Sequence, residues 1–157
     1  MPNTSAGILM YRHDRDGPRV LLAHPGGPFW RNRDEGAWTV PKGEAGAGEA
    51  PEQVARREFE EELGARVVGP LTPLGGLRQR GGKWVEAFAT DGEFDVASLR
   101  SNEFQLEWPP RSGKLALFPE VDRAAWFSLG EARRKILPSQ LVLIDRLQAL
   151  LELRDGN

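Results

Sequence analysis

The chain has 157 residues, of which 39% are hydrophobic and 28% charged, so we expect one globular domain spanning residues 1–157. Its 21 basic and 23 acidic side chains leave a formal charge of −2, which provides no positive field to attract a nucleic-acid polymer or an anionic membrane. With no cysteine and two histidines, the sequence excludes disulfides and thiolate sites and disfavours a histidine-rich zinc site, so any metal is expected to have oxygen ligands.

Two apolar runs near the start of the chain, residues 6–12 and 19–24, predict a hairpin of core strands, because the polar segment between them favours a turn. Two prolines and two glycines follow between residues 25 and 28, so the stretch as far as Gly36 is expected to form a surface loop. The segment 38–40, Trp-Thr-Val, then predicts a short strand that leads into Pro-Lys-Gly.

Residues 50–63 predict the clearest helix of the chain. They contain no internal glycine, Pro51 falls in the first turn where proline is tolerated, and Gly64 follows where a C-terminal cap is expected. Apolar residues recur at helical spacing on one side and leave the acidic residues on another: Val54, Ala55, Phe59 and Leu63.

The second half of the chain predicts further strands and one more helix. Strands are expected at residues 66–68, 71–79, 84–90, 103–108 and 124–127, separated by Gly-Pro, Gly-Gly and Pro-Pro breaks. Residues 139–153 carry one apolar stripe and predict a terminal helix. The pattern as a whole is that of a mixed sheet with helices.

The helix around residue 60 carries the residues that point to chemistry. Glu58, Glu61 and Glu62 are three and four positions apart, so their carboxylates project from one edge of the helix. Like charges at this spacing cost roughly 0.2–0.5 kcal/mol per pair, a cost that a divalent cation would remove. Magnesium completes its coordination with water and phosphate oxygens, which favours a phosphorylated ligand. On spacing alone, a solvated acidic face remains the alternative interpretation.

The segment from Gly43 to Ala65 resembles the Nudix box, which runs Gly-x5-Glu-x7-Arg-Glu-apolar-x-Glu-Glu-x-Gly-apolar. The matching residues are Gly43, Glu49, Arg57, Glu58, Phe59, Glu61, Glu62 and Gly64. Only Ala65, at the final apolar position, is a weak match. Seven fully specified positions would coincide by chance at about 10⁻⁸ per register, so the motif is highly specific.

The resemblance implies an α/β fold, the Nudix-type α/β/α sandwich with a mixed central sheet. It also implies hydrolysis of a pyrophosphate bond in a small nucleotide-like substrate, with Mg²⁺ or Mn²⁺ as cofactor. The metal ligands carried over from the family are Glu49, Glu58, Glu61, Glu62 and the carbonyl of Lys42. The catalytic residues implied are Glu58 as general base, Glu61, and Arg57 as an orienting partner of the glutamates.

Residues outside the box are candidates for holding the substrate. Lys42, Arg31 and Arg33 could reach phosphate oxygens, although arginines in a polar loop are more often solvated. Trp30 and Trp108 could stack on a nucleobase, whereas Trp38, Trp84 and Trp126 lie on predicted strands and are expected in the core.

Two further polar positions have competing interpretations. Glu120 stands where some members of the family carry a further acidic residue, and we count it with the substrate-contacting candidates; a solvated turn carboxylate is the alternative. His13 and His24 are expected to be exposed or structurally hydrogen-bonded, because a carboxylate can serve as base at a metal site.

The approach to the box, residues 38–43, is similar to that of diadenosine polyphosphate hydrolases and favours a dinucleoside polyphosphate substrate. Against this, Arg80, Gly81 and Gly82 stand where those enzymes often carry a tyrosine, and the proline of many ADP-ribose hydrolases is missing too. Alternatives are nucleoside triphosphate, ADP-ribose and inositol pyrophosphate hydrolases, or a nucleotide-sensing module without turnover. Residues 1–7 lack a signal-peptide pattern, so cytoplasmic residence is expected; no oligomeric state is specified.

Overall fold

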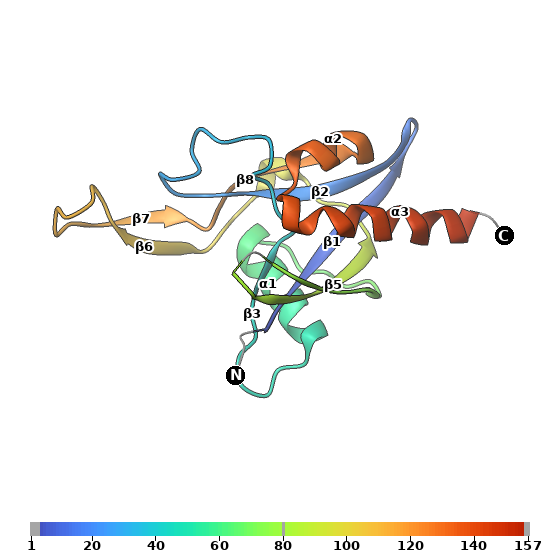
Figure 1. Cartoon of the computed structure of the whole chain (residues 1–157), viewed down its shortest axis with the longest axis horizontal. Coiled ribbons are helices and arrows are strands. Elements are labelled where there is room, and N and C mark those ends of the chain that lie inside the picture. Colours follow the sequence, from blue (N-terminus) through green and yellow to red (C-terminus); the bar gives the residue numbers. More distant parts are fainter. Residues whose placement is uncertain (1–3, 80, 156–157) are drawn as a thin grey trace.

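The computed structural model describes residues 4–79 and 81–155 and is built around one mixed sheet (Figure 1). The strand order is β4-β5-β1-β2-β8, and β3 pairs with β1 beside this path. The strands are β1 (Thr4–Asp14), β2 (Gly17–Pro25), β3 (Lys42–Glu44), β4 (Thr72–Arg78), β5 (Trp84–Asp91) and β8 (Val121–Ser128). Parallel pairing of β1 with β5 and antiparallel pairing elsewhere confirm the predicted mixed sheet.

Helices cover both faces of this sheet. Helix α1 (Pro51–Leu63) lies on one face, and α2 (Leu129–Lys135) and α3 (Leu141–Asp155) lie on the other (Figure 1). Each face has its own cluster of buried apolar residues, with α1 packed into one and α3 into the other. This three-layer arrangement confirms the expected α/β/α sandwich. None of the helices in the described ranges is long and apolar enough to cross a membrane.

Strand β1 occupies the centre because its two edges serve three partners. One edge pairs with β5 from Thr4 to Tyr11, and the other pairs with β3 near Gly7 and with β2 from Tyr11 onward. Since β2 and β3 use different ends of the same edge, they diverge between these points. The segment that joins them passes through this gap, where Ile8 donates its backbone N–H to the carbonyl of Pro41.

The strand predicted at residues 38–40 is wrong by a few positions, since the regular strand begins only at Lys42. Residues 38–40 make backbone contacts with three different parts of the fold instead of pairing with a single strand. Trp38 bridges to Ile136, and Thr39 exchanges backbone hydrogen bonds with Ala23. The next amide, that of Val40, donates to the buried side chain of Gln140 at 3.0 Å.

Helix α1 confirms the most secure prediction from the sequence. The side-chain oxygen of Gln53 accepts a hydrogen bond from the backbone nitrogen of Ala50 at the N-terminus. Gly64 ends the helix at φ 85°, a left-handed conformation that suits glycine, and its N–H donates to the carbonyl of Glu60. The predicted apolar stripe is buried, and Glu58 and Glu62 are buried with it.

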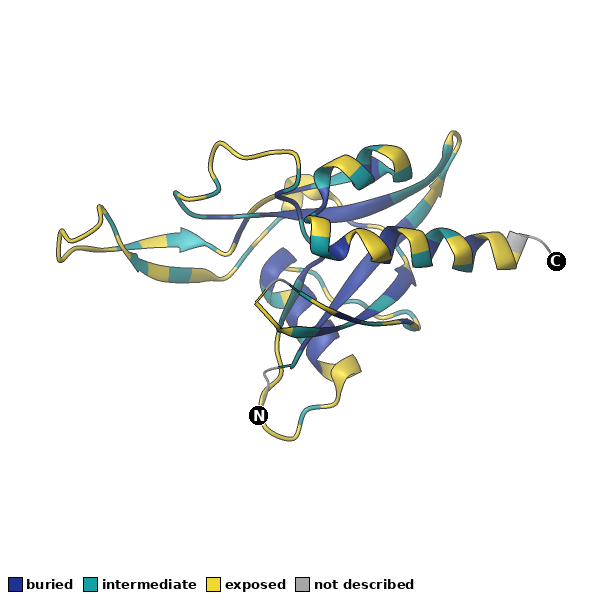
Figure 2. Cartoon of the chain, viewed as in Figure 1, coloured by how far each residue is buried: buried dark blue, intermediate teal, exposed yellow. Residues whose placement is uncertain are grey.

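The strand expected at residues 66–68 is wrong. This stretch follows α1 as irregular chain: the guanidinium of Arg56 donates to the carbonyls of Val67 and Gly69, and no strand among the described residues pairs with the stretch. The strand expected near residue 105 is confirmed as β6 (Glu103–Glu107), but its partner β7 (Leu115–Pro119) was not predicted. Together they form a hairpin that projects from the sandwich (Figure 1) and is largely exposed (Figure 2).

The connection from β8 to the terminal helix also differs from the prediction. Helix α2 was not expected; it begins after Ser128, whose side chain accepts a hydrogen bond from the backbone of Glu131. A short 3₁₀ turn (Pro138–Gln140) follows, and α3 then runs close to the predicted terminal helix. Of the tryptophans expected in the core, Trp38 is buried, whereas Trp84 and Trp126 are half-buried.

Candidate active site

The acidic edge of α1 faces β3, and the contact between them is close. Glu58 and Glu62 are 8% and 9% exposed, so two of the three predicted carboxylates lie at the interface rather than in solvent. A methyl group added to Gly43 would lie 2.0 Å from the carboxyl carbon of Glu58. Gly43 therefore leaves the space that the Glu58 side chain occupies.

Arg57 holds the glutamates of the box together. Its Nε and Nη2 donate to the two carboxylate oxygens of Glu49 at 2.9 and 2.8 Å, and its Nη2 also reaches the carbonyl of Glu44. Nη1 donates to Glu58 at 2.9 Å and to Glu61 at 3.3 Å. The structure thus brings together the residues that the sequence predicted as catalytic, with Arg57 at their centre.

Burial and mutual repulsion perturb the acids of this region. Burial, opposed by the charge of Lys42, raises the pKa of Glu62 to about 8. Burial and then the charge of Glu61 raise the pKa of Glu58 above its ordinary value, and the same two causes raise the pKa of Glu120. Desolvation also lowers the pKa of Lys42, whose ammonium group is partly stabilised by Glu62. Ionising these carboxylates in the folded protein therefore costs free energy.

The carboxylate oxygens of this region match a hard divalent cation such as Mg²⁺ or Mn²⁺, because such an ion stabilises oxygen ligands whose charges repel each other. Within residues 4–79 and 81–155, however, no three acidic or histidine side chains converge into a preformed cluster. Glu58 and Glu61 are turned onto Arg57, which supplies part of the compensating charge. The carboxylate oxygens therefore suit a divalent cation. Two of the carboxylates that would hold it, those of Glu58 and Glu61, are also paired with Arg57.

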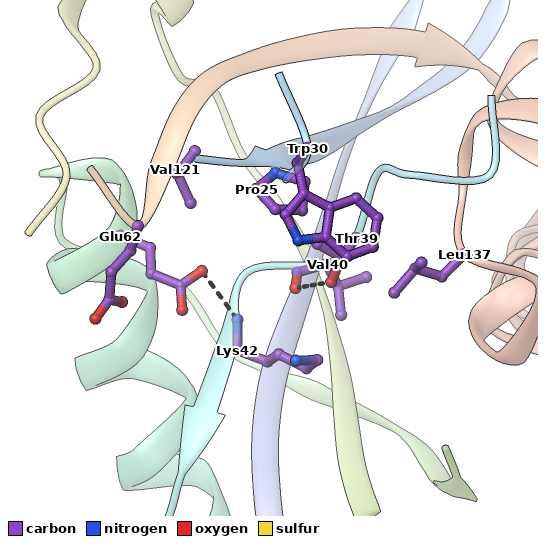
Figure 3. Close-up of a pocket in the computed structure, with 9 residues that line it drawn as sticks. Pro25, Trp30, Thr39, Val40, Lys42, Glu62, Val121 and Leu137 are labelled. Carbon is purple, nitrogen blue, oxygen red and sulfur yellow. Dashed lines mark hydrogen bonds between the residues drawn. The ribbon is translucent and has the colours of Figure 1, made fainter. Parts of the chain in front are cut away.

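A cavity of about 240 Å³ opens beside this acidic edge (Figure 3). Among the residues that line it are four of the sequence candidates: Trp30, Lys42, Glu62 and Glu120. The backbone nitrogen of Lys42 faces the carboxylate of Glu62, and the Lys42 side chain extends away from it (Figure 3). Residues from the loop, from β3, from α1 and from the start of β8 therefore meet at one cavity.

A second cavity of about 360 Å³ adjoins the first, because Trp30 and Leu137 line both. Its wall includes Arg33, whose guanidinium lies 5.7 Å from the centre of the Trp30 ring, and Gln79. The side-chain nitrogen of Gln79 is buried without a hydrogen-bond partner in the part of the chain that the structure describes. Sequence reasoning missed Gln79, since a lone glutamine at the end of a strand carries no local signal.

Two of the substrate-contacting candidates lie outside both cavities. Arg31 is exposed on the loop, and Trp108 stands on the β6–β7 hairpin with its ring against Phe29. Trp30 is thus the tryptophan that the fold brings to the acidic edge. His24 is fully buried and hydrogen-bonded, which agrees with its structural interpretation. Of the three residues that stand where diadenosine polyphosphate hydrolases often carry a tyrosine, Arg80 lies outside the described residues.

The structure combines a three-layer sandwich with a glutamate-bearing helix at the edge of a cavity. The chain belongs to the NUDIX domain family, whose model matches residues 1–147. The resemblance drawn from the box therefore holds over most of the chain, and not over the motif alone.

Solved structures share the fold at low sequence identity. A MutT/Nudix family protein from Listeria innocua has a TM-score of 0.65 at 19% identity, over 98% of this chain and 97% of that one. A binary complex of the Ap4A hydrolase of C. elegans has a TM-score of 0.63 at 23% identity, over 95% and 97%. The NUDIX domain of Shewanella oneidensis NrtR, complexed with ADP ribose, has a TM-score of 0.64 at 16% identity, over 96% and 89%.

A curated relative is similar over part of its length. It is a protein of Myxococcus xanthus named octanoyltransferase, 34% identical over 137 residues, which are 86% of this chain. The match covers 33% of that protein, so the chain spans about a third of the length of this relative.

Proposed function

We propose that the protein hydrolyses a pyrophosphate bond in a nucleoside diphosphate linked to another moiety, with dinucleoside polyphosphates favoured, in a reaction that requires Mg²⁺ or Mn²⁺. The observation that carries this proposal is the position of Trp30, which lines both the cavity beside the acidic edge of α1 and the second cavity that adjoins it. A phosphate chain bound at Lys42 and the glutamates would bring an attached base within reach of the Trp30 ring. Aromatic faces bind nucleobases by stacking.

The glutamates divide into distinct roles in this proposal. Glu49, Glu58, Glu61 and Glu62, with the carbonyl of Lys42, would hold the cation. When bound, a divalent cation neutralises charge on phosphoryl oxygens and lowers the pKa of water. Glu58 accepts the proton of the attacking water, and burial and the charge of Glu61 raise its pKa, which makes it a stronger base than a solvated glutamate. Arg57 orients Glu58 and Glu61 through its Nη1 hydrogen bonds.

The second cavity provides room for the moiety on the far side of the diphosphate. The unpartnered nitrogen of Gln79 would donate to an acceptor on that moiety, and Arg33 would add a positive charge beside it. The structural neighbours described as an Ap4A hydrolase and as a complex with ADP ribose support a substrate of this size and chemistry.

The test is a turnover screen with Mg²⁺ or Mn²⁺ over diadenosine polyphosphates, ADP-ribose, nucleoside triphosphates and inositol pyrophosphates. We expect the diadenosine polyphosphates to have the highest kcat/KM, excess EDTA to abolish turnover, and Mg²⁺ to raise Tm by mass action. Glu58→Gln is the inactive control. Activity that persists in EDTA contradicts the metal assignment, and a wild-type rate equal to that of buffer across the whole panel indicates a nucleotide-sensing module.

A further inference from the structure

His24 lies at the end of β2 with no exposed surface, and both of its ring nitrogens contact an oxygen. Nδ1 lies 2.8 Å from Oδ1 of Asp122 on β8, and Nε2 lies 2.6 Å from the backbone carbonyl of Arg33 in the loop that carries Trp30. A backbone carbonyl has no proton to give. The ring therefore joins the loop to the edge strand of the sheet.

The partner of Nε2 determines where a ring proton is needed. A carbonyl oxygen only accepts, so the 2.6 Å contact is a hydrogen bond only when Nε2 carries the proton and donates it to Arg33. On the other side of the ring, the guanidinium of Arg123 lies 3.8 Å from the same Asp122 oxygen that faces Nδ1.

Other charged and aromatic groups pack near the ring. The Trp38 ring meets His24 edge-on at 5.1 Å, and its Nε1 donates to Asp34. Asp34 also pairs with Lys135, and these two hydrogen bonds, that from Lys135 first, lower its pKa. Asp34 therefore stays ionised through the neutral range, so it cannot cause a change in loop anchoring there.

The connection continues from His24 to the cavity wall. The amide of Arg33, whose carbonyl faces His24, donates to the carbonyl of Trp30 at 3.0 Å. At the start of the loop, Gly26 donates to the carbonyl of Glu120 at 2.9 Å. Arg33 thus links the Trp30 backbone to the Nε2 hydrogen bond of His24, while Gly36, at the far end of the loop, donates to the carbonyl of Arg134.

We propose that His24 is a positioning residue, whose Nε2 hydrogen bond to Arg33 fixes the loop of residues 26–36 and sets the Trp30 ring at the boundary of the two cavities. Loss of that hydrogen bond releases the loop. The consequence for substrate binding rests on the proposed function, whereas the hydrogen bonds and the anchoring of the loop do not.

Two substitutions separate the two nitrogens, because the amide nitrogen of glutamine reaches the place of Nε2 and that of asparagine the place of Nδ1. His24→Gln keeps a donor for Arg33, and His24→Asn keeps one for Asp122. The first measurement is hydrogen exchange of amides 26–36, with the 108–114 turn of the β6–β7 hairpin as internal reference. The second is the dissociation constant of ADP, used as a probe in the presence of Mg²⁺.

We expect His24→Asn to increase exchange in the loop and to raise the Kd of ADP several-fold, while His24→Gln stays near the wild type. Equal behaviour of the two variants, or a looser loop with unchanged ADP affinity, overturns the proposal. Failure of the wild type to turn over any substrate contradicts only the proposed function.

The wild-type protein decides the matter even if neither variant folds. Long-range ¹H–¹⁵N spectra report the proton on each ring nitrogen of a histidine, and the chain has two histidines, of which His13 is exposed and serves as reference. We expect a proton on Nε2 of His24, because its partner is a carbonyl oxygen. A His24 ring protonated on Nδ1 alone overturns the proposal.

Discussion

The carboxylate of Glu62 accepts a hydrogen bond from the backbone nitrogen of Lys42 at 3.4 Å, so this buried acid is matched by an amide. Among the described residues no cation lies within salt-bridge distance of Glu62. The charge of Lys42 acts on it from further away and only partly opposes the effect of burial. Ionisation of Glu62 therefore destabilises the folded state relative to the unfolded state.

The pH dependence of stability should report this cost. The pKa of Glu62 is about 8 in the folded state, against 4.5 for an unperturbed glutamate, so the folded state binds the proton more tightly. Its contribution favours folding at low pH and is lost as the pH rises from about 4.5 through about 8. In EDTA, Glu62→Gln should therefore match the wild type near pH 4.5 and be more stable above pH 8. The gain is of order a few kcal/mol, at about 1.4 kcal/mol per pKa unit. Thermal unfolding across this range is the measurement, and a constant difference between the two proteins contradicts the assignment.

Function and stability should move in opposite directions along the acidic edge. Glu58→Gln and Glu61→Gln should each lower kcat by about 10²–10⁴-fold, the range for losing a general base, while leaving the metal-free Tm unchanged or slightly raised. Glu60 is the matched control, since it is exposed on the same helix and lies outside the Arg57 network. Its glutamine variant should keep a kcat close to that of the wild type. Equal losses for Glu60→Gln and Glu61→Gln would show that the assignment is wrong.

Gly43 should tolerate no side chain. A Cβ there overlaps the carboxyl group of Glu58, so Gly43→Ala must displace Glu58 from β3 and should lower both kcat and Tm, at about 1–3 kcal/mol for overpacking. Gly130→Ala is the control, because nothing lies within 4 Å of an added Cβ at that position of α2. It should raise Tm slightly, as alanine is the better helix former. Steady-state kinetics and thermal unfolding of both variants provide the comparison.

The Trp30 ring should contribute binding energy more than rate. If it stacks on a base in both the ground and the transition state, Trp30→Ala raises KM roughly ten-fold or more and changes kcat less, since stacking is worth about 1–3 kcal/mol per base. Trp108→Ala removes an equally large ring from the hairpin, away from both cavities, and should leave KM unchanged. A large loss of folded protein in Trp30→Ala would instead assign the ring to the core.

Local signals were sufficient to predict α1 and its acidic edge. Pro51 and Gly64 mark the ends of the helix, and the spacing of Glu58 and Glu62 places them on one side. Their burial could not be predicted in the same way. It arises because β3, which begins about twenty residues earlier, crosses directly against them at Gly43.

Elements defined by distant partners were the ones that sequence reasoning misplaced. Residues 38–40 have strand propensity, yet their hydrogen bonds connect them to Ala23, Gln140 and the two neighbours of Ile136, which come together only in the finished fold. The same holds for the second cavity, where Gln79 meets the 26–36 loop and the turn before α3. Such residues take their roles from tertiary neighbours and not from a local pattern.

The pairing of β2 with β8 has a consequence for folding kinetics. This ladder joins Arg19 to Ser128 and Pro25 to Val121. Pro25 and Val121 both line the cavity beside the acidic edge of α1. Contacts between residues so distant in sequence form late, because the entropy of closing a long loop must be overcome first. A refolding chain can therefore acquire the complete glutamate motif on α1 before it has a cavity. In stopped-flow refolding, the far-ultraviolet helical signal should recover before catalytic competence, which appears only when β8 docks.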